Sequence, residues 1–501
     1  MDLRPAALMS ALSVCNIIVG FAFQALVAAL LGTNAVVDVF SAGVAVPTVI
    51  ATAVLGAAPI VLVPAYSHHL VGEPNALSRR SLELLLLCAA LLSIVLFVAA
   101  SPLAVGLAPG FSSERRHQLE VFLRIVAVVP LLATVAALGQ AFAYSARRFG
   151  LAGSSAIANG AFLLGATVLA QRDGLTASDL AWSVVIGYLG QVAWVAPQVL
   201  RTTRTLTGDS TRQANRTLLI TLGFMAVTSI FYKSQPVIER LLGSTVSEGL
   251  PAALSYAGRF GQGLTLVASF AVSLVAMPQL ADAVAARDWS FTQRIISISL
   301  TFTLVTTLCV VGFCVACYQR LPEVVLQRGD FTQDDARVTG DLLLAFVPGI
   351  AAGTLAGPLV NAYYALRRQH FVAYVGIAGT ALGGLASALL AGIYGGPGIT
   401  LGTSLGFIIT LMVFATRLSS VIPSWSWRAY LFEIRLWLGV GAISVTGLAA
   451  LGAWLPHPHA AATRAIWLTV LLAASAAALP GLALLFGWRP PKGWIRGVTT
   501  A

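Results

Sequence analysis

The sequence predicts an all-α, polytopic membrane protein with about 14 transmembrane helices. Of its 501 residues, 58% are hydrophobic and only 10% are charged, whereas a soluble protein has about 25% charged residues. Apolar runs of about 20 residues, the length that crosses a bilayer, follow one another along the chain. A third observation, an internal repeat, indicates that these helices form two related halves. The composition excludes a soluble enzyme.

The predicted spans are the apolar runs between Arg, Gly and Pro residues. They are residues 7–31, 36–66, 81–107, 119–145, 151–171, 180–200, 217–243, 250–283, 295–317, 341–366, 370–394, 396–417, 437–455 and 465–487. All five cysteines lie within these runs. Because a redox or zinc site needs exposed thiolates and further ligands, we interpret them as buried, inert thiols and expect no metal or cofactor.

The net charge of +11 is explained by topology rather than by nucleic-acid binding. If the N-terminus lies inside, the inner loops carry 19 Lys and Arg residues and the outer loops carry 7. Positive residues accumulate in the cytoplasmic loops of polytopic proteins. We therefore predict that both termini are cytoplasmic and that nucleic acid is not a partner.

Two short motifs recur at the same spacing. Phe111-Ser112-Ser113-Glu114 recurs as Phe331-Thr332-Gln333-Asp334, and Tyr144-Ser145-Ala146-Arg147-Arg148 recurs as Tyr364-Ala365-Leu366-Arg367-Arg368, both 220 residues later. Six helices per repeat is an even number, so both halves enter the membrane from the same side, as in parallel-repeat transporters. The predicted domains are an N-terminal lobe (1–205), a C-terminal lobe (206–418) and a helix pair with a cytoplasmic tail (419–501).

Charged residues inside the spans are candidates for a functional site, because they are costly in a bilayer. Arg259 and Lys233 are expected near the middle of their spans, and Lys233 and Arg240, seven residues apart, are expected on one helix face. With the offset of 220 residues, Asp38 is equivalent to Gly258, the neighbour of Arg259. The pseudosymmetry would therefore place Asp38 and Arg259 across the interface between the lobes. Two interpretations stay open: structural ion pairs, such as Glu239 with Arg240 or Asp38 with Arg259, or a cationic cavity for an anionic headgroup.

Other classes of protein are less compatible with the sequence. There is no Walker motif and no recognisable catalytic constellation, so we expect a transporter rather than an enzyme, driven by the membrane potential or an H⁺ or Na⁺ gradient. An exporter of small amphipathic cations would need an acidic site, whereas the charges within the spans are mainly basic. The glycine-rich patches 383–384 and 402–406 favour close helix packing rather than phosphate binding.

Several segments in order along the chain resemble the MurJ/MviN family of the MOP (multidrug/oligosaccharidyl-lipid/polysaccharide) exporter superfamily. They are Val19-Gly20-Phe21-Ala22, Asp38-Val39-Phe40, Val63-Pro64-Ala65-Tyr66, Ala108-Pro109-Gly110-Phe111, Tyr256-Ala257-Gly258-Arg259, Met277-Pro278-Gln279-Leu280 and Leu326-Gln327-Arg328-Gly329-Asp330-Phe331-Thr332. The resemblance implies two six-helix lobes and an extra helix pair. It also implies a flippase for polyprenyl-pyrophosphate-linked saccharides in the bacterial inner membrane.

The resemblance carries over Asp38, Arg259 and the pair Glu239-Arg240, whereas Lys233 is a candidate because of its charge within a span. We expect Arg259, Lys233 and Arg240 to bind the phosphates of the substrate, and Asp38 and Glu239 to form gating contacts or ion pairs. Asp38 could equally be a carboxylate that couples transport to an ion.

The sequence also departs from the family pattern in the first lobe. Family members usually have two arginines in the first helix and a pair after the proline of the second, where this chain has Asn16-Ile17, Phe23-Gln24 and Ala51-Thr52. The expected substrate is therefore either lipid II-like or an exopolysaccharide repeat unit on a polyprenyl carrier. The alternative function is a MATE-like exporter driven by an ion gradient. A monomer is compatible with the sequence.

Overall fold

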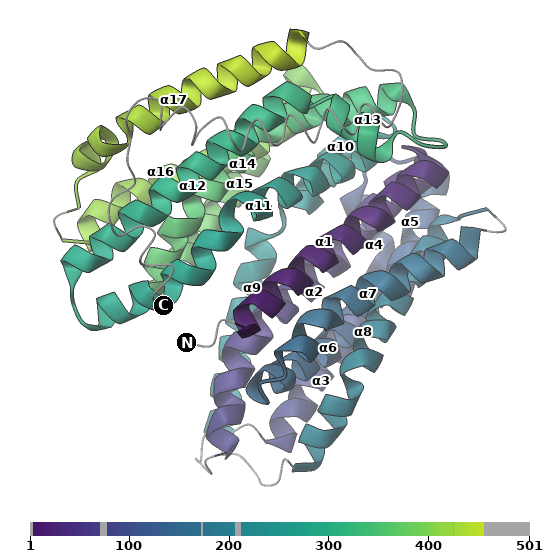
Figure 1. The fold of residues 1–501 in the computed structure, drawn as a ribbon. Coiled ribbons are helices and arrows are strands. Elements are labelled where there is room, and N and C mark those ends of the chain that lie inside the picture. The colour runs from purple at the N-terminus through teal and green to yellow at the C-terminus, as the bar shows by residue number, and fades with distance from the viewer. Residues whose placement is uncertain (1–3, 71–77, 172–173, 206–211, 424, 455–501) are drawn as a thin grey trace. The chain divides into compact units, whose positions relative to one another are not determined.

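The computed structural model describes residues 4–70, 78–171, 174–205, 212–423 and 425–454, and within these ranges all regular secondary structure is helical (Figure 1). The chain divides into two compact units. We call them the N-unit, Leu3–Ser255 with Arg328–Thr332, and the C-unit, Tyr256–Gln327 with the described residues from Gln333 onwards. The division into lobes of six helices each stays a prediction.

The N-unit contains ten complete helices among its described residues. They are α1 (Arg4–Leu31), α2 (Ala35–Leu70), α3 (Arg79–Val98), α4 (Ala100–Leu107), α5 (Ser113–Val126), α6 (Val129–Ser145), α7 (Phe149–Ala170), α8 (Ala177–Thr205), α9 (Arg212–Tyr232) and α10 (Gln235–Val246). Helix α11 (Leu250–Ala285) begins in the N-unit and continues into the C-unit. The other described helices of the C-unit are α12 (Trp289–Cys317), α13 (Arg320–Leu326), α14 (Gln333–Ala365), α15 (Gln369–Tyr394), α16 (Gly396–Val421) and α17 (Trp427–Trp454).

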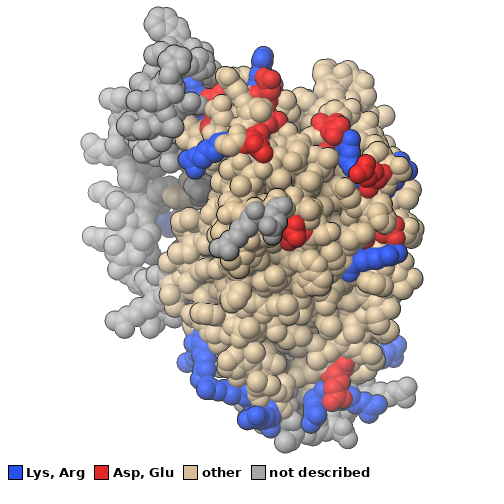
Figure 2. Space-filling view, turned by 90° about the vertical axis from the view of Figure 1, so that its right-hand side faces the viewer, with Lys and Arg blue, Asp and Glu red and all other residues tan. Residues whose placement is uncertain are grey.

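The predicted all-α membrane fold is confirmed. Ten helical segments of the described residues are long and apolar enough to cross a membrane. Large apolar side chains are exposed on the protein surface, including Val98 at 76% and Ile393 at 71%, which is favourable in hydrocarbon and unfavourable in water. Much of the face in Figure 2 carries neither acidic nor basic residues. The predicted span 465–487 lies outside the described residues.

Three predicted spans consist of two helices each. The breaks separate α3 from α4, α5 from α6 and α9 from α10. Pro130 and Pro236 lie in the first turn of α6 and α10, where the missing N–H of proline has no effect and its ring prevents the preceding helix from continuing. The short helix α13 was not predicted, and α17 begins at Trp427, ten residues before the predicted span.

Two of the cysteines differ from the prediction of buried thiols. Cys314 and Cys317 are buried, as expected, but Cys15 and Cys88 are exposed on the surface of the protein. Both exposed cysteines lie on helices that are long and apolar enough to cross a membrane.

The two copies of the Tyr-containing motif form turns of the same geometry, one after α6 and one after α14. After α6, Arg147 has a φ of 56°, and its N–H donates to Tyr144 O over 3.0 Å. After α14, Arg367 also has a φ of 56°, and its N–H donates to Tyr364 O over 3.0 Å. Left-handed backbone is uncommon for a residue other than glycine. The two motifs thus share this turn conformation, which Arg287 after α11 also adopts with a φ of 55°.

Helices α15 and α16 pack backbone against backbone, as the glycine-rich patches predict. A Cβ atom at Gly402 would overlap the backbone of Ser387, and one at Gly406 would crowd Gly379 and Gly383. The close approach allows the Ser387 hydroxyl to donate to Ile399 O over 2.7 Å. Small residues allow this contact in a membrane, where van der Waals packing holds helices together.

We expect Gly402→Ala and Gly392→Ala to change stability in opposite directions. The new methyl group at Gly402 forces α15 and α16 apart and destabilises the protein by about 1–3 kcal/mol. At Gly392, which lies in α15, a Cβ meets no atom within 4 Å, and alanine favours the helix by up to about 1 kcal/mol. Thermal unfolding in detergent measures both changes, and equal midpoints for the two variants would contradict the close packing.

Candidate gating and substrate-binding site

Asp38 lies in the first turn of α2, and its side chain is fully buried. Its Oδ2 accepts a hydrogen bond from the Gly249 N–H over 2.7 Å, and its Oδ1 accepts one from the Ala252 N–H over 3.0 Å. These donors belong to the beginning of α11, where backbone N–H groups have no partner within the helix. Asp38 therefore caps a helix 211 residues away in the sequence, and its negative charge is favoured by the positive end of the helix dipole.

Further contacts lie at the same junction of the N-unit. Arg115 at the start of α5 forms an ion pair with Glu248 over 2.8 Å, and the Gly110 N–H approaches Ser244 Oγ at 3.5 Å. The short chain between α10 and α11 is thus held by α5, the beginning of α11 by α2, and the end of α10 by the loop before α5.

In the same unit, the end of α1 contacts residues 328–332. The Asp330 N–H donates to Ala29 O over 3.0 Å, and a Cβ at Gly329 would overlap the same carbonyl group. Gly329 also has a φ of 59°, a second reason for glycine at this position. We call the contacts of Asp38, Arg115, Gly110 and Ala29 with residues 244–252 and 328–332 the latch.

Arg240 lies on α10, next to the buried Glu239. Its Nη1 donates to Pro236 O over 2.6 Å within the same helix. Its Nε is buried and has no hydrogen-bond partner within the described part of the chain. A buried donor without an acceptor is costly, so Arg240 has an unused capacity to bind an anion.

Lys233 occupies the break between α9 and α10. Its exposed ammonium group lies 3.4 Å from Thr52 O on α2, and it is close to Gly56 on the same helix. The prediction that Lys233 and Arg240 share one helix face is wrong, because the helix is broken between them, where Pro236 begins α10. The break instead directs Lys233 to the middle of α2, where it forms no ion pair with any described residue.

Arg259 lies on the part of α11 that belongs to the C-unit, and its side chain is half-buried. It forms no ion pair among the residues that the structure describes. A Cβ added at the neighbouring Gly258 would meet no atom within 4 Å, so there is open space beside Arg259 on this helix. The roles of these five residues in transport stay predictions.

Charge-based reasoning from the sequence found Asp38 but missed its partners, which are backbone groups. Gly110 and Gly329 each lie in a segment that carries the family resemblance, and a glycine that permits close backbone approach is the signal that could have identified the latch. Within the described ranges, no group of three or more His, Cys, Asp or Glu residues could hold a metal ion.

Comparison with known proteins identifies the family. The family model for the lipid II flippase MurJ matches residues 27–462, which is most of the chain. The chain belongs to the MurJ family. Two curated relatives are both named as probable lipid II flippases MurJ. The protein of Rhizobium meliloti (strain 1021) is 25% identical over an alignment that covers 91% of this chain and 89% of the relative. The protein of Rhizobium tropici is 28% identical over an alignment that covers 82% of this chain and 80% of the relative.

Solved structures of a MurJ protein and of a MATE transporter have a fold similar to that of this chain. A lipid II flippase MurJ in an inward closed conformation aligns with a TM-score of 0.75 and 15% identity, covering 94% of this chain and 98% of its own. An inward-facing MATE multidrug transporter of the MOP superfamily aligns with a TM-score of 0.66 and 12% identity, covering 82% and 96%. As a MurJ-family protein, this chain is a multi-pass membrane transporter rather than an enzyme.

We expect Asp38→Ala to loosen the beginning of α11. The substitution leaves two backbone N–H groups without an acceptor, at a cost of about 1–3 kcal/mol each, so their hydrogen exchange becomes about tenfold faster or more. Glu248→Ala is the control, because an ion pair with one exposed partner contributes about 1 kcal/mol or less. Hydrogen-exchange mass spectrometry of a peptide covering residues 248–255 measures the change. An equal, small effect of both variants would show that Asp38 does not cap α11.

Proposed function

We propose that this protein flips a polyprenyl-pyrophosphate-linked saccharide of the lipid II type across the bacterial inner membrane by alternating access, with both termini in the cytoplasm. Membership of the MurJ family supports the substrate class. The observation that carries the proposal is the excess of basic over acidic groups, with Lys233 and Arg240 in the N-unit and Arg259 in the C-unit. Such groups suit a substrate with a strongly negative headgroup.

Each basic residue can contribute in its own way. The buried Nε of Arg240 has no partner within the described residues, so a phosphate oxygen would satisfy it and form a charge-assisted hydrogen bond. Lys233 offers an exposed point charge on a flexible stem, and its present acceptor is only a backbone carbonyl at 3.4 Å. Arg259 offers a planar fork suited to a pyrophosphate. Glu239 offsets part of the positive charge of Arg240.

The latch is proposed as the gate. In alternating access, the contacts of Asp38 with the beginning of α11 form in one state and separate in the other. Protonation of Asp38 would weaken both of its hydrogen bonds, because charged acceptors bind about twice as strongly as neutral ones. A gate and a coupling carboxylate are therefore compatible roles for one residue, and an H⁺ gradient or the membrane potential would then drive transport.

An exopolysaccharide repeat unit on a polyprenyl carrier is the second candidate substrate. It is favoured by Asn16, Gln24 and Thr52, which stand in the neighbourhoods where family members usually have arginine. Lys233 lies against Thr52 and supplies one positive charge at that place on α2. A MATE-like export activity has less support, since the likeness to MATE structures extends to the fold alone.

Complementation distinguishes the two substrates. We expect the wild-type protein to sustain growth of a bacterial strain depleted of its own lipid II flippase, and Arg259→Ala to abolish rescue. Arg79→Ala, which removes an exposed pair with Glu83, is the control that should still rescue. Membrane fractions verify expression of each variant. Absence of rescue by well-expressed wild-type protein would contradict lipid II transport and favour the exopolysaccharide substrate.

Substitutions of Lys233 test the binding of phosphate directly. We expect Lys233→Gln to weaken binding of a soluble pyrophosphate-linked saccharide about tenfold or more, since one charge-assisted contact contributes about 1.5–3 kcal/mol. Lys233→Arg should keep most of the affinity. Calorimetric titration at two salt concentrations measures both, and equal affinity of the glutamine variant and the wild-type would place Lys233 outside the binding site.

A further inference from the structure

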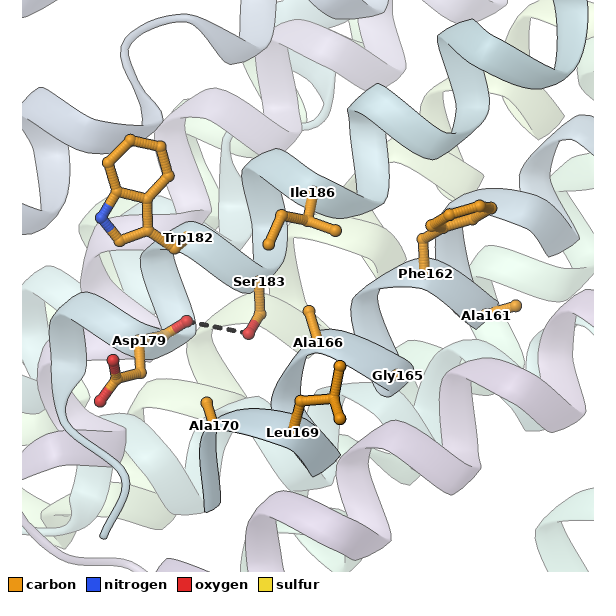
Figure 3. A pocket seen from close by; sticks show the side chains of 10 residues that line it. All are labelled: Ala161, Phe162, Gly165, Ala166, Leu169, Ala170, Asp179, Trp182, Ser183 and Ile186. Carbon is orange, nitrogen blue, oxygen red and sulfur yellow. Dashed lines mark hydrogen bonds between the residues drawn. The ribbon is translucent and has the colours of Figure 1, made fainter. Parts of the chain in front are cut away.

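A groove lies between α7 and α8 in the N-unit, outside the proposed substrate site. It has a volume of about 630 Å³, and its side chains are shown in Figure 3. The wall formed by α7 consists mainly of small residues spaced one to five positions apart, Ala161, Gly165, Ala166 and Ala170. Residues four positions apart lie near one face of a helix, so Ala161 with Gly165, and Ala166 with Ala170, give α7 a surface of small side chains beside the groove.

The helix contacts explain why the groove opens towards one end. At its closed end, the ring of Phe162 occupies the space that a Cβ at Gly190 would need, and Gly187 approaches the backbone of Asn159. Glycines on α8 thus permit close packing there. Towards Ala170 and Trp182 the helices present no such glycine contacts, and a Cβ at Gly165 would meet no atom within 4 Å. The groove is therefore open space rather than a tight interface.

The open end has the character of a membrane–water interface. Trp182, 55% exposed, lies beside Asp179 at the beginning of α8 (Figure 3). Tryptophan is enriched where hydrocarbon meets the headgroups. The Ser183 hydroxyl is already bound to the Asp179 carbonyl over 2.8 Å, which leaves the lining of the groove almost entirely apolar.

Asp179 provides a negative charge at this end. Its Oδ2 accepts hydrogen bonds from the Thr176 N–H and hydroxyl, at 2.9 and 2.6 Å, which fixes the side chain at the beginning of α8. Its Oδ1 has no partner among the described residues, and in Figure 3 the carboxylate points away from Ser183 and the apolar lining. A carboxylate at headgroup level is complementary to an ammonium group and repels an anionic headgroup.

We propose that this groove binds a phospholipid with an ammonium-bearing headgroup, such as phosphatidylethanolamine. One acyl chain lies along Ala161, Gly165 and Ala170, and the ammonium group lies at Asp179. Since lipid tails are as apolar as the groove, the selectivity comes from the shape of the groove and from the charge at its end. The site is distinct from the basic residues proposed to hold the transported headgroup, and its test does not depend on transport.

Photo-crosslinking in nanodiscs tests the acyl-chain contact. The probe is phosphatidylethanolamine with a diazirine on its acyl chain, and the full-length protein is digested and mapped after irradiation. We expect labels to concentrate on peptides that contain residues 161–170 and 182–186. Gly165→Leu fills the groove and should reduce this labelling at least about fivefold, the factor that corresponds to about 1 kcal/mol.

The matched control is Gly223→Leu on α9, where a Cβ also meets no atom within 4 Å and the residue is exposed; it should leave the labelling unchanged. Ala170→Leu is a second groove variant in case Gly165→Leu does not fold, as judged by size-exclusion chromatography. Labels spread evenly over the exposed helices, or labelling unaffected by the folded groove variant, would overturn the proposal.

The headgroup is tested with a phosphatidylglycerol probe that carries the same diazirine chain. We expect it to label the groove about two- to fivefold less than the ethanolamine lipid, as is usual for an exposed charge pair. Asp179→Asn keeps an oxygen to accept from Thr176 and should remove the difference. Equal labelling by the two lipids with wild-type protein would overturn the assignment of an ammonium headgroup.

Discussion

The N-unit depends on one requirement: a buried charge and the free N–H groups at a helix start must both find partners where water is scarce. The Asp38 carboxylate meets both needs in a single contact, since it binds Gly249 and Ala252 at the beginning of α11. If either side moved away, a fully buried anion and two backbone donors would be left unsatisfied together. The separation of α2 from α11 is therefore all-or-none unless solvent or a proton replaces the lost contacts.

The positions of the basic residues follow from the same need for partners. Lys233 stands at a break between two helices, where the interrupted backbone frees its side chain to approach the Thr52 carbonyl. Arg240 is held by a carbonyl of its own helix and keeps a buried N–H without an acceptor among the described residues. The buried N–H of Arg240 without an acceptor is unfavourable for stability alone, which is why a basic group of this kind is informative about function.

The fold class and most helices could be predicted from the sequence because hydropathy alone decides which segments enter a bilayer. The breaks could not be placed in the same way: Pro348 and Pro358 lie inside the continuous helix α14, whereas Pro130 and Pro236 begin new helices. Whether a proline interrupts a helix depends on which neighbours satisfy the freed carbonyl groups. For the site, charge counting identified Asp38 and Lys233, but the partners of both are backbone atoms, which carry no signature in the sequence.

At two glycines the latch is a close approach of main-chain atoms, and this determines how substitutions at these positions affect it. A Cβ at Gly329 would overlap the carbonyl group of Ala29, and a Cβ at Gly110 would overlap that of Ser244. Truncation of a side chain that forms no bond in the latch leaves these backbone groups in place, whereas a methyl group added to Gly110 or Gly329 would force the two segments apart. The latch therefore depends on the Asp38 carboxylate at one place and on the absence of a side chain at another, and natural variation at the two glycines should be narrow.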